Sequence, residues 1–188
     1  MKELWRGFVV LVFMTILTGL LYPLLMTGVG QVVFSHQVNG SLIDQEGVLM
    51  GSNLIGQNFT SPKYFWARPS ATLPAYNAAS SAASNLGPSN PQLIVNVKEQ
   101  INKLLAADPS QKALIPIDLV TMSGSGLDPD ISVAAAEYQA PRVAGARHLS
   151  IEQVSELISK NTTLPQFGFM GQERVNVLKL NLALDALR

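Results

Sequence analysis

The chain contains no cysteine, and this absence removes several chemical classes at once. Disulfides, thiol catalysis, cysteine-ligated metals and a lipid-modified cysteine anchor all require a thiol. His36 and His148 are the only histidines, so the chain also lacks a ligand spacing for zinc. We interpret His36 as an interface residue rather than a metal ligand.

The chain also lacks the motifs that bind or receive the terminal phosphate of ATP. No lysine follows a glycine, so no phosphate-binding Gly-Lys-Ser/Thr loop exists. No Asp-Lys-Thr-Gly-Thr segment offers an aspartate for phosphorylation. The chain therefore is not an ATPase by itself, and no nucleotide cofactor of its own is expected.

Charge is scarce as well. Charged residues make up 14% of the chain, and 11 basic and 12 acidic residues follow Arg6. A protein that binds nucleic acid through the phosphate backbone normally carries a basic surface. The near balance of charge argues against a nucleic-acid partner.

One long stretch has no charge at all. From Gly7 to Ser35 no acidic or basic side chain occurs, and most residues up to Met26 are apolar. About 20 such residues in a helix span the hydrocarbon core of a bilayer. We predict a cytoplasmic N-terminus over 1–6, a transmembrane helix over 7–28 and one soluble domain over 29–188, with lipid around the helix.

A cleaved signal peptide is the alternative interpretation, because Lys2 and Arg6 precede the apolar run. Signal peptides have a shorter apolar core and a small-residue cleavage site, for which Gly28-Val29-Gly30 is the only candidate. The length of the run favours a retained anchor. The basic residues before it predict a single-pass protein with a cytoplasmic N-terminus and a C-terminal domain outside the cytoplasm.

Four residues of the predicted helix share one face. Thr15, Thr18, Gly19 and Tyr22 follow the spacing i, i+3, i+4 and i+7. Small and hydroxyl side chains let helices approach closely in lipid, so this face is a candidate packing surface for another helix. A lone anchor tolerates the same residues anywhere, which is the alternative. Pro23 predicts a bend near the outer end.

Beyond the anchor, the pattern predicts an α+β domain. We expect a hairpin around the polar turn 44–47, a long surface loop over 70–91, and a helix from Pro91 with Asn90 as its N-cap. The spacing predicts an i,i+4 pair between Glu99 and Lys103 and an apolar face on the opposite side, formed by Ile94, Val97, Ile101, Leu104 and Leu105. Alternation over 115–119 predicts a sheet-edge strand.

The C-terminal half is predicted to contain more helix. An Ala-rich helix is expected over 132–147, kinked or split by Pro141, followed by a helix with a Ser150–Gln153 capping box. The tail predicts a strand from Val175 to about Leu180 and then a helix capped by Asn181.

The loop 123–126 invites an enzymatic interpretation. Ser123-Gly124-Ser125-Gly126 lacks the first glycine of a nucleophile elbow, so a structural turn is favoured. Ser125, Asp128 and His148 are nevertheless the residues that an anchored extracytoplasmic hydrolase would use as a triad. This hydrolase is the alternative function.

In their joint order, many short segments resemble one family over nearly the whole chain. That family is KdpC, the C subunit of the bacterial Kdp potassium-transporting P-type ATPase. The matching positions are Gln31, 39–41, 51–59, 64–65, 68–71, 76–77, 84–86, 89–91, 120–121, 125–128, Gln139, 141–144, 146–147, 175–177 and 180–185.

The resemblance implies an essential accessory subunit that is not itself an enzyme. It implies a complex in which KdpA carries potassium, KdpB hydrolyses ATP and KdpF is a small neighbour. Family members are described as catalytic chaperones that raise the ATP affinity of KdpB, and Gln57 is the position that matches a glutamine proposed to contact nucleotide. The alternative for Gln57 is a loop-stabilising amide, because an outside domain is separated from cytoplasmic ATP.

Overall fold

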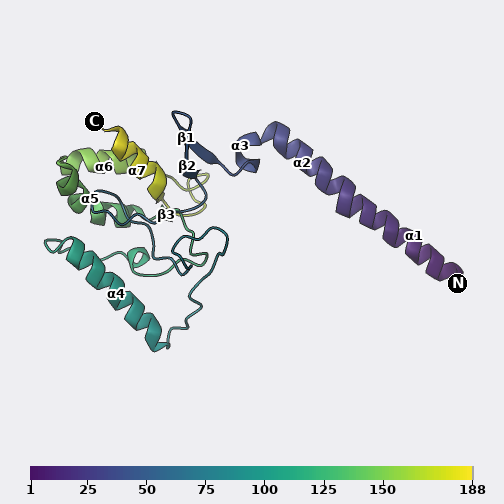
Figure 1. Ribbon diagram of the computed structural model, residues 1–188, viewed down its shortest axis with the longest axis horizontal. Coiled ribbons are helices and arrows are strands. Elements are labelled where there is room, and N and C mark those ends of the chain that lie inside the picture. Colours follow the sequence, from purple (N-terminus) through teal and green to yellow (C-terminus); the bar gives the residue numbers. More distant parts are fainter. Residues whose placement is uncertain (188) are drawn as a thin grey trace. The chain divides into compact units, whose positions relative to one another are not determined.

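A computed structural model describes residues 1–187 of the chain (Figure 1). The residues form two compact units, Met1–Met50 and the part that begins at Gly51. The first unit is dominated by one long helix, and the second combines four helices with a small sheet. The predicted α+β class with one N-terminal membrane-length helix is confirmed.

The long helix runs from Lys2 to Val33 and is apolar enough to cross a membrane, because an 18-residue window within it has a mean hydropathy of 2.4. It consists of α1 (Lys2–Ile16), a π-helical turn η1 (Leu17–Leu21) and α2 (Tyr22–Val33). Pro23 is the second residue of α2, which follows the π-helical turn directly. Proline has no backbone N–H and cannot donate a helical hydrogen bond. The wider π-helical turn therefore lies where the series of backbone hydrogen bonds along the helix is interrupted.

The predicted hairpin is confirmed after a short helix α3 (Ser35–Val38). Strands β1 (Leu42–Gln45) and β2 (Val48–Ser52) pair with each other. Glu46 and Gly47 have φ values of 54° and 80°, which the tight two-residue turn requires. The Asp44 carboxylate accepts a hydrogen bond from Gly47 N at 2.9 Å.

In the second unit, a three-stranded antiparallel sheet has the order β3-β5-β4. Val175 is central, because it pairs with Ile131 on one side and Thr162 on the other. The strands and helices of this unit are β3 (Asp130–Ile131), β4 (Thr162–Thr163), β5 (Arg174–Asn176), α4 (Pro91–Ala107), η2 (Ile117–Leu119), α5 (Val133–Arg147), α6 (Ile151–Lys160) and α7 (Val177–Ala186).

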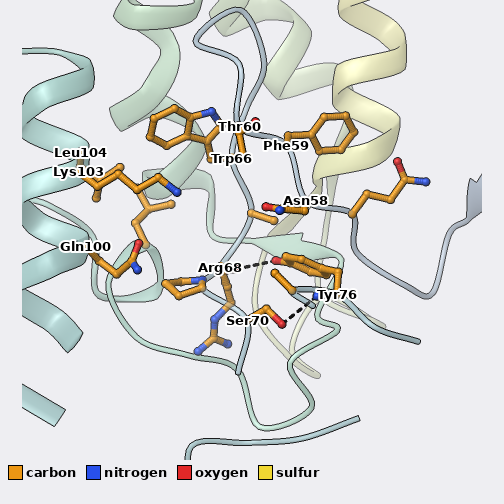
Figure 2. Close-up of a pocket in the computed structure, with 15 residues that line it drawn as sticks. Asn58, Phe59, Thr60, Trp66, Arg68, Ser70, Tyr76, Gln100, Lys103 and Leu104 are labelled. Carbon is orange, nitrogen blue, oxygen red and sulfur yellow. Dashed lines mark hydrogen bonds between the residues drawn. The ribbon is translucent and has the colours of Figure 1, made fainter. Parts of the chain in front are cut away.

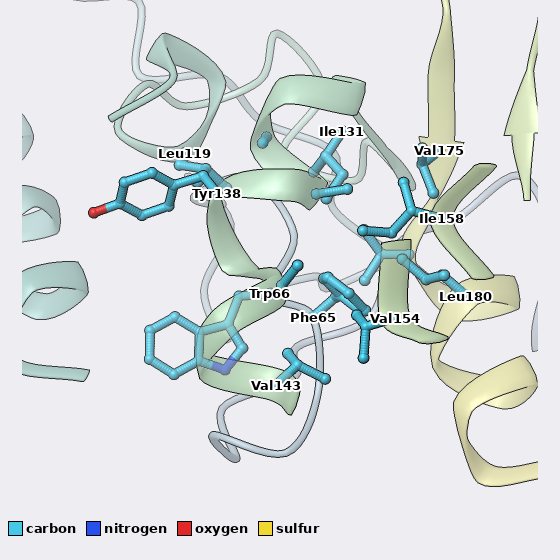
Figure 3. Packing of buried hydrophobic residues seen from close by; sticks show 14 of the residues in the cluster. Phe65, Trp66, Leu119, Ile131, Tyr138, Val143, Val154, Ile158, Val175 and Leu180 are labelled. Carbon is cyan, nitrogen blue, oxygen red and sulfur yellow. The ribbon is translucent and has the colours of Figure 1, made fainter. Parts of the chain in front are cut away.

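The core lies among α5, α6, α7 and the sheet (Figure 3). Phe65 is fully buried there, although it comes from an irregular segment. Its companions in the core include Ile131, Val143, Val154, Ile158, Val175, Leu180 and Leu184. Removing such apolar surface from water is the main stabilising contribution to the domain.

Local capping signals are confirmed in two helices, α4 and α6. The Asn90 side chain accepts from Gln92 N, and the Ser150–Gln153 capping box is complete. Helix α5 runs without a break through Pro141, so Pro141 does not split it, and the alternative, a kink, stays a prediction. Pro141 is exposed, and the remaining hydrogen bonds and the buried face keep this helix together.

The predicted strand over 115–119 is wrong. The 3₁₀-helical turn η2 occupies its second half, with Leu119 buried and Ile117 exposed. The Asp118 carboxylate accepts hydrogen bonds from Ser132 N at 2.8 Å and from Ser132 Oγ at 3.2 Å. The segment therefore supports the start of α5 through a side chain instead of pairing with a strand.

The predicted tail was also wrong in detail. Strand β5 ends at Asn176, and α7 begins at once with Asn176 as the N-cap, whose side chain accepts from Lys179 N at 3.1 Å. Asn181, the predicted cap, lies inside α7 and is buried. Both asparagines have the short amide that caps a helix, and tertiary contacts decide which of them does so.

Helix α4 carries only one buried residue, Leu104. Ile94 and Leu105, predicted for its apolar face, are exposed. Lys103 Nζ lies 5.1 Å from the centre of the Trp66 ring, and no ion pair with Glu99 occurs among residues 1–187. A cation–π contact takes the place of the predicted helical pair.

Candidate functional site

A pocket of about 250 Å³ lies where α4 meets two irregular segments of the second unit (Figure 2). Its walls come from residues 57–60, residues 66–70 and the α4 residues Gln100, Lys103 and Leu104. Tyr76 closes it from the loop predicted over 70–91. That loop has no helix or strand, as predicted, yet its residue Thr72 is buried.

Tyr76 is fixed against the pocket wall. Its hydroxyl donates to Arg68 O, and its backbone N donates to Ser70 Oγ at 3.1 Å (Figure 2). A Cβ at Gly56 would lie 2.5 Å from the Tyr76 ring, so only glycine permits this approach. Burial raises the pKa of Tyr76 above its ordinary value, which keeps the hydroxyl protonated and able to donate.

Arg68 and Lys103 are the two positively charged residues that line the pocket, and Arg68 is already paired. Its Nη1 lies 3.1 Å from the Asp128 carboxylate, and its Nη2 donates to Met122 O at 3.3 Å. Arg68 Nε is buried without a hydrogen-bond partner among the described residues. The guanidinium therefore ties residues 122–128 to the pocket wall.

Residues 62–66 lead to the pocket wall at Trp66 and are held by α5 and α7. The Gln139 side chain accepts from Trp66 N at 2.8 Å and donates to Trp66 O at 3.1 Å. The Asn181 side chain makes the same two contacts with Phe65, at 2.8 and 3.0 Å. Two carboxamides thus satisfy backbone groups that a neighbouring strand would otherwise pair with.

Two arginines of α5 also hold residues 62–66, and together with Gln139 and Asn181 they form a clamp on this segment. Arg142 donates to Pro62 O and lies 4.3 Å from the Trp66 ring centre, while burial lowers its pKa to about 10. Arg147 donates to Lys63 O at 2.8 Å and pairs with Asp185 at 2.6 Å. Residues 62–66 are consequently a rigid element without being a strand.

Gln57 lines the pocket, together with Lys103 and Arg68. A Cβ at Gly51 would collide with the Gln57 amide nitrogen, so this glycine lets the side chain lie flat against the backbone. Pockets for drug-sized ligands usually measure about 300–1,000 Å³, so this one suits a smaller polar group. The nucleotide contact predicted for Gln57 stays a prediction.

The three residues of the alternative hydrolase triad do not form a triad among the described residues. Ser125 Oγ accepts from Leu127 N at 3.1 Å, and Asp128 pairs with Arg68. His148 is exposed at the left-handed C-terminus of α5 and makes no hydrogen bond with either of them in residues 1–187. A general base needs hydrogen-bond reach to its nucleophile, which this arrangement lacks.

The loop 123–126 is a structural turn, as the sequence favoured. Ser123 Oγ accepts from Gly126 N at 2.9 Å, and Ser125 O accepts from Ala82 N at 3.0 Å and from Ser81 Oγ at 2.8 Å. The turn thus fastens the long 70–91 loop to the domain. No group of three or more histidine, aspartate or glutamate residues suited to a metal occurs in the described part of the chain.

The candidate packing face on the long helix is accessible along its length. The hydroxyls of Thr15 and Thr18 donate to Leu11 O and Met14 O, so both are satisfied within the helix. A Cβ at Gly19 would lie 4.0 Å from Thr15 Cγ2, which places these two positions on one side. Tyr22 follows after the π-helical turn. The role of this face stays a prediction.

The sequence alone assigned no role at the pocket to Trp66, Arg68, Tyr76 or Gln139, and it assigned Asn181 only the role of a helix cap. All but Trp66 lie in the segments that carried the family resemblance, but composition and spacing did not show that they meet. One sequence signal could have identified Gln139 and Asn181. A glutamine or asparagine on the buried face of a helix requires hydrogen-bond partners from another segment.

Comparison with known proteins gives one consistent result. The family model described as "KdpC: K+-transporting ATPase, c chain" matches residues 4–186. A potassium-transporting ATPase KdpC subunit from Methylococcus capsulatus is 58% identical over 93% of this chain and 92% of its own length. Those from Polaromonas naphthalenivorans and Serratia proteamaculans are 56% and 54% identical over 100% of this chain and 97% and 100% of their own lengths. The chain therefore belongs to the KdpC family of K+-transporting ATPase subunits.

Proposed function

We propose that this chain is an accessory, non-catalytic subunit of a Kdp-type potassium uptake complex. The observation that carries the proposal is the family match over residues 4–186 in a chain without a phosphate-binding loop or a phosphorylation motif. In this proposal KdpA conducts potassium, KdpB hydrolyses ATP and KdpF is a further membrane partner. The chain supports assembly and raises the apparent ATP affinity of KdpB.

The helix face is the proposed contact with the membrane part of the complex. Gly19 has no side chain, so a partner helix approaches its backbone closely, with Thr15 and Thr18 beside it. We expect Gly19→Leu to reduce the co-purified KdpA and KdpB at least about fivefold, because added bulk separates the two helices. The measurement is affinity purification of the tagged, co-expressed complex in mild detergent.

Gly7→Leu is the matched control, since Gly7 lies twelve residues before Gly19, outside the proposed face, and no atom lies within 4 Å of a Cβ built there. It should leave the yield of the other subunits unchanged. Recovery of the wild-type chain alone, under conditions that preserve other membrane complexes, would contradict the accessory role. Equal yields from Gly19→Leu and wild type would contradict the helix face only.

The proposed orientation places the N-terminus in the cytoplasm and the second unit outside, at the inner membrane. The absence of cysteine permits a direct test with single-cysteine variants. A membrane-impermeant maleimide added to intact spheroplasts should label exposed Ser110→Cys and leave Glu3→Cys unlabelled until lysis. The reverse pattern would overturn the orientation.

This orientation also bears on Gln57. Because it puts Gln57 on the opposite side of the membrane from cytoplasmic ATP, we propose that the effect on ATP affinity is exerted through assembly with KdpB. The paired state of Arg68 supports this proposal, since a nucleotide phosphate would have to compete with Asp128 for the guanidinium.

A further inference from the structure

Residues 51–57, where the chain enters the second unit, have the composition of a flexible linker but are closely packed. We call these residues the entry segment. It contains two glycines, Gly51 and Gly56, together with a serine and an asparagine, which are typical of chain boundaries that bend. In the structure, however, Leu54 is the only exposed residue of the segment, and Gly56 is buried.

Near the end of the entry segment, Gly56 occupies a space too small for any side chain. A Cβ at this position would lie 2.5 Å from Tyr76 Cε1 and 2.6 Å from Asp128 O. The Gly56 N–H donates to Leu127 O at 2.9 Å. Glycine is required here because the neighbouring atoms approach so closely, and its amide is fastened to the turn at 127–128.

At the start of the entry segment, the Gln57 side chain fills the space over Gly51. A Cβ at Gly51 would collide with Gln57 Nε2, and it would lie 3.6 Å from Gln57 Cδ. It would also lie 3.2 Å from Leu178 Cδ2 in the first turn of α7. The two ends of the entry segment are therefore folded onto each other and against α7.

Asn176 fastens the middle of the entry segment. This residue is only 8% exposed. Its Nδ2 donates to Asn53 O at 3.0 Å and to the Asp130 carboxylate at 3.2 Å, and its Oδ1 accepts from Lys179 N at 3.1 Å. One carboxamide therefore joins the entry segment, β3 and the start of α7. Opening this junction is costly, because it leaves buried polar groups without partners.

The same contacts decide whether the entry segment suits a nucleotide phosphate. Glycine-rich phosphate loops keep the space over their glycines open, so that backbone N–H groups reach the anion. In residues 51–57, the chain's own atoms occupy the space over Gly51 and over Gly56, and the Gly56 amide is already bonded. The entry segment does not fit a phosphate loop.

We propose that the entry segment is a rigid joint and that Gln57 is a positioning residue, whose side chain holds the joint closed by covering Gly51. With the joint closed, a displacement of the chain at Met50 moves α7 and the sheet together instead of bending a linker. The joint consists of contacts within the second unit, so the inference does not rest on the proposed function.

A double-mutant cycle on the full chain in detergent tests the role of Gln57. Gly51→Ala should lower the unfolding midpoint by about 6–10 °C, because its methyl group collides with the Gln57 amide and its φ of 151° is unfavourable. Gln57→Ala removes the amide but not the backbone strain. In that background Gly51→Ala should therefore cost at most about half as many degrees.

Gly124→Ala is the matched control, because no atom lies within 4 Å of a Cβ built there. Its effect on the midpoint should be the same in the wild type and in Gln57→Ala to within about 1 °C. Equal losses from Gly51→Ala in the two backgrounds would overturn the inference, because the Gln57 side chain would then not occupy the space over Gly51.

Hydrogen exchange of the wild type gives a second measurement that needs no variant to fold. The Gly56 amide should exchange at least about 100-fold more slowly than an unstructured amide, because it is buried and bonded. The amide of Leu114, which is 95% exposed, is the reference and should show less than about tenfold protection. Less than about 100-fold protection at Gly56 would overturn the rigid joint. Neither failure changes the co-purification of other subunits, so the proposed function would stand.

Discussion

Replacing Gln139 with leucine should lower the free energy of unfolding of the second unit by about 3 kcal/mol. The side chain satisfies both backbone groups of Trp66 and accepts from Arg142 Nη2 at 2.8 Å. Leucine fills similar space but leaves these buried groups without partners, each at a cost of about 1–3 kcal/mol before relaxation. Urea denaturation of the full chain in detergent measures the change.

Trp66 fluorescence reports this unfolding cleanly in a Trp5→Phe background, because the chain has only two tryptophans. Gln172→Leu is the matched control, since Gln172 is exposed, and it should change the free energy by less than about 0.5 kcal/mol. A loss below about 1 kcal/mol for Gln139→Leu would show that water or a rearranged side chain satisfies Trp66. The clamp on residues 62–66 would then be unimportant for stability.

Gly126→Ala should be similarly destabilising, by about 3 kcal/mol. Gly126 has a φ of +69°, and an added Cβ would lie 2.6 Å from Ala82 O and 2.8 Å from Thr72 Cγ2. Both the left-handed backbone and the overlap act against alanine, and the 70–91 loop would have to move. The unfolding midpoint of the full chain, followed by circular dichroism, measures the effect.

Gly124→Ala provides a control in the same loop. No atom lies within 4 Å of a Cβ built at Gly124, and its φ lies outside the left-handed region. Alanine there should be neutral to within about 0.5 kcal/mol or slightly stabilising, because it restricts the unfolded chain. Equal losses from the two variants would show that loop flexibility, rather than the tight packing at Gly126, determines the outcome.

Several features were predictable because they depend on neighbours within a few residues. The membrane-length helix follows from the uncharged run that begins at Gly7. The N-caps Asn90 and Ser150 bond to backbone groups two or three residues away, and the hairpin turn needs only Glu46 and Gly47. Such interactions are encoded locally, so pattern and propensity identify them.

The candidate pocket was not predictable in the same way. Gln57 was selected by resemblance, but the residues around it come from distant segments such as 66–70, Tyr76 and α4. The alternation over 115–119 predicted a strand because the pattern does not reveal whether a partner strand is available. Likewise, Ser125, Asp128 and His148 are the residue types that a catalytic triad needs, but the fold does not bring them into hydrogen-bond contact with one another.

The sequence by itself determined a single membrane-length helix, an α+β domain and the lack of a phosphate-binding loop and a phosphorylation motif, since these depend on run length, local capping and residue types. Only the tertiary structure decided that Asn176, rather than Asn181, caps the last helix. Asn181 instead pairs with Phe65, 116 residues away. The reason is that a buried backbone segment must find hydrogen-bond partners wherever the fold brings them, and local sequence does not record that choice.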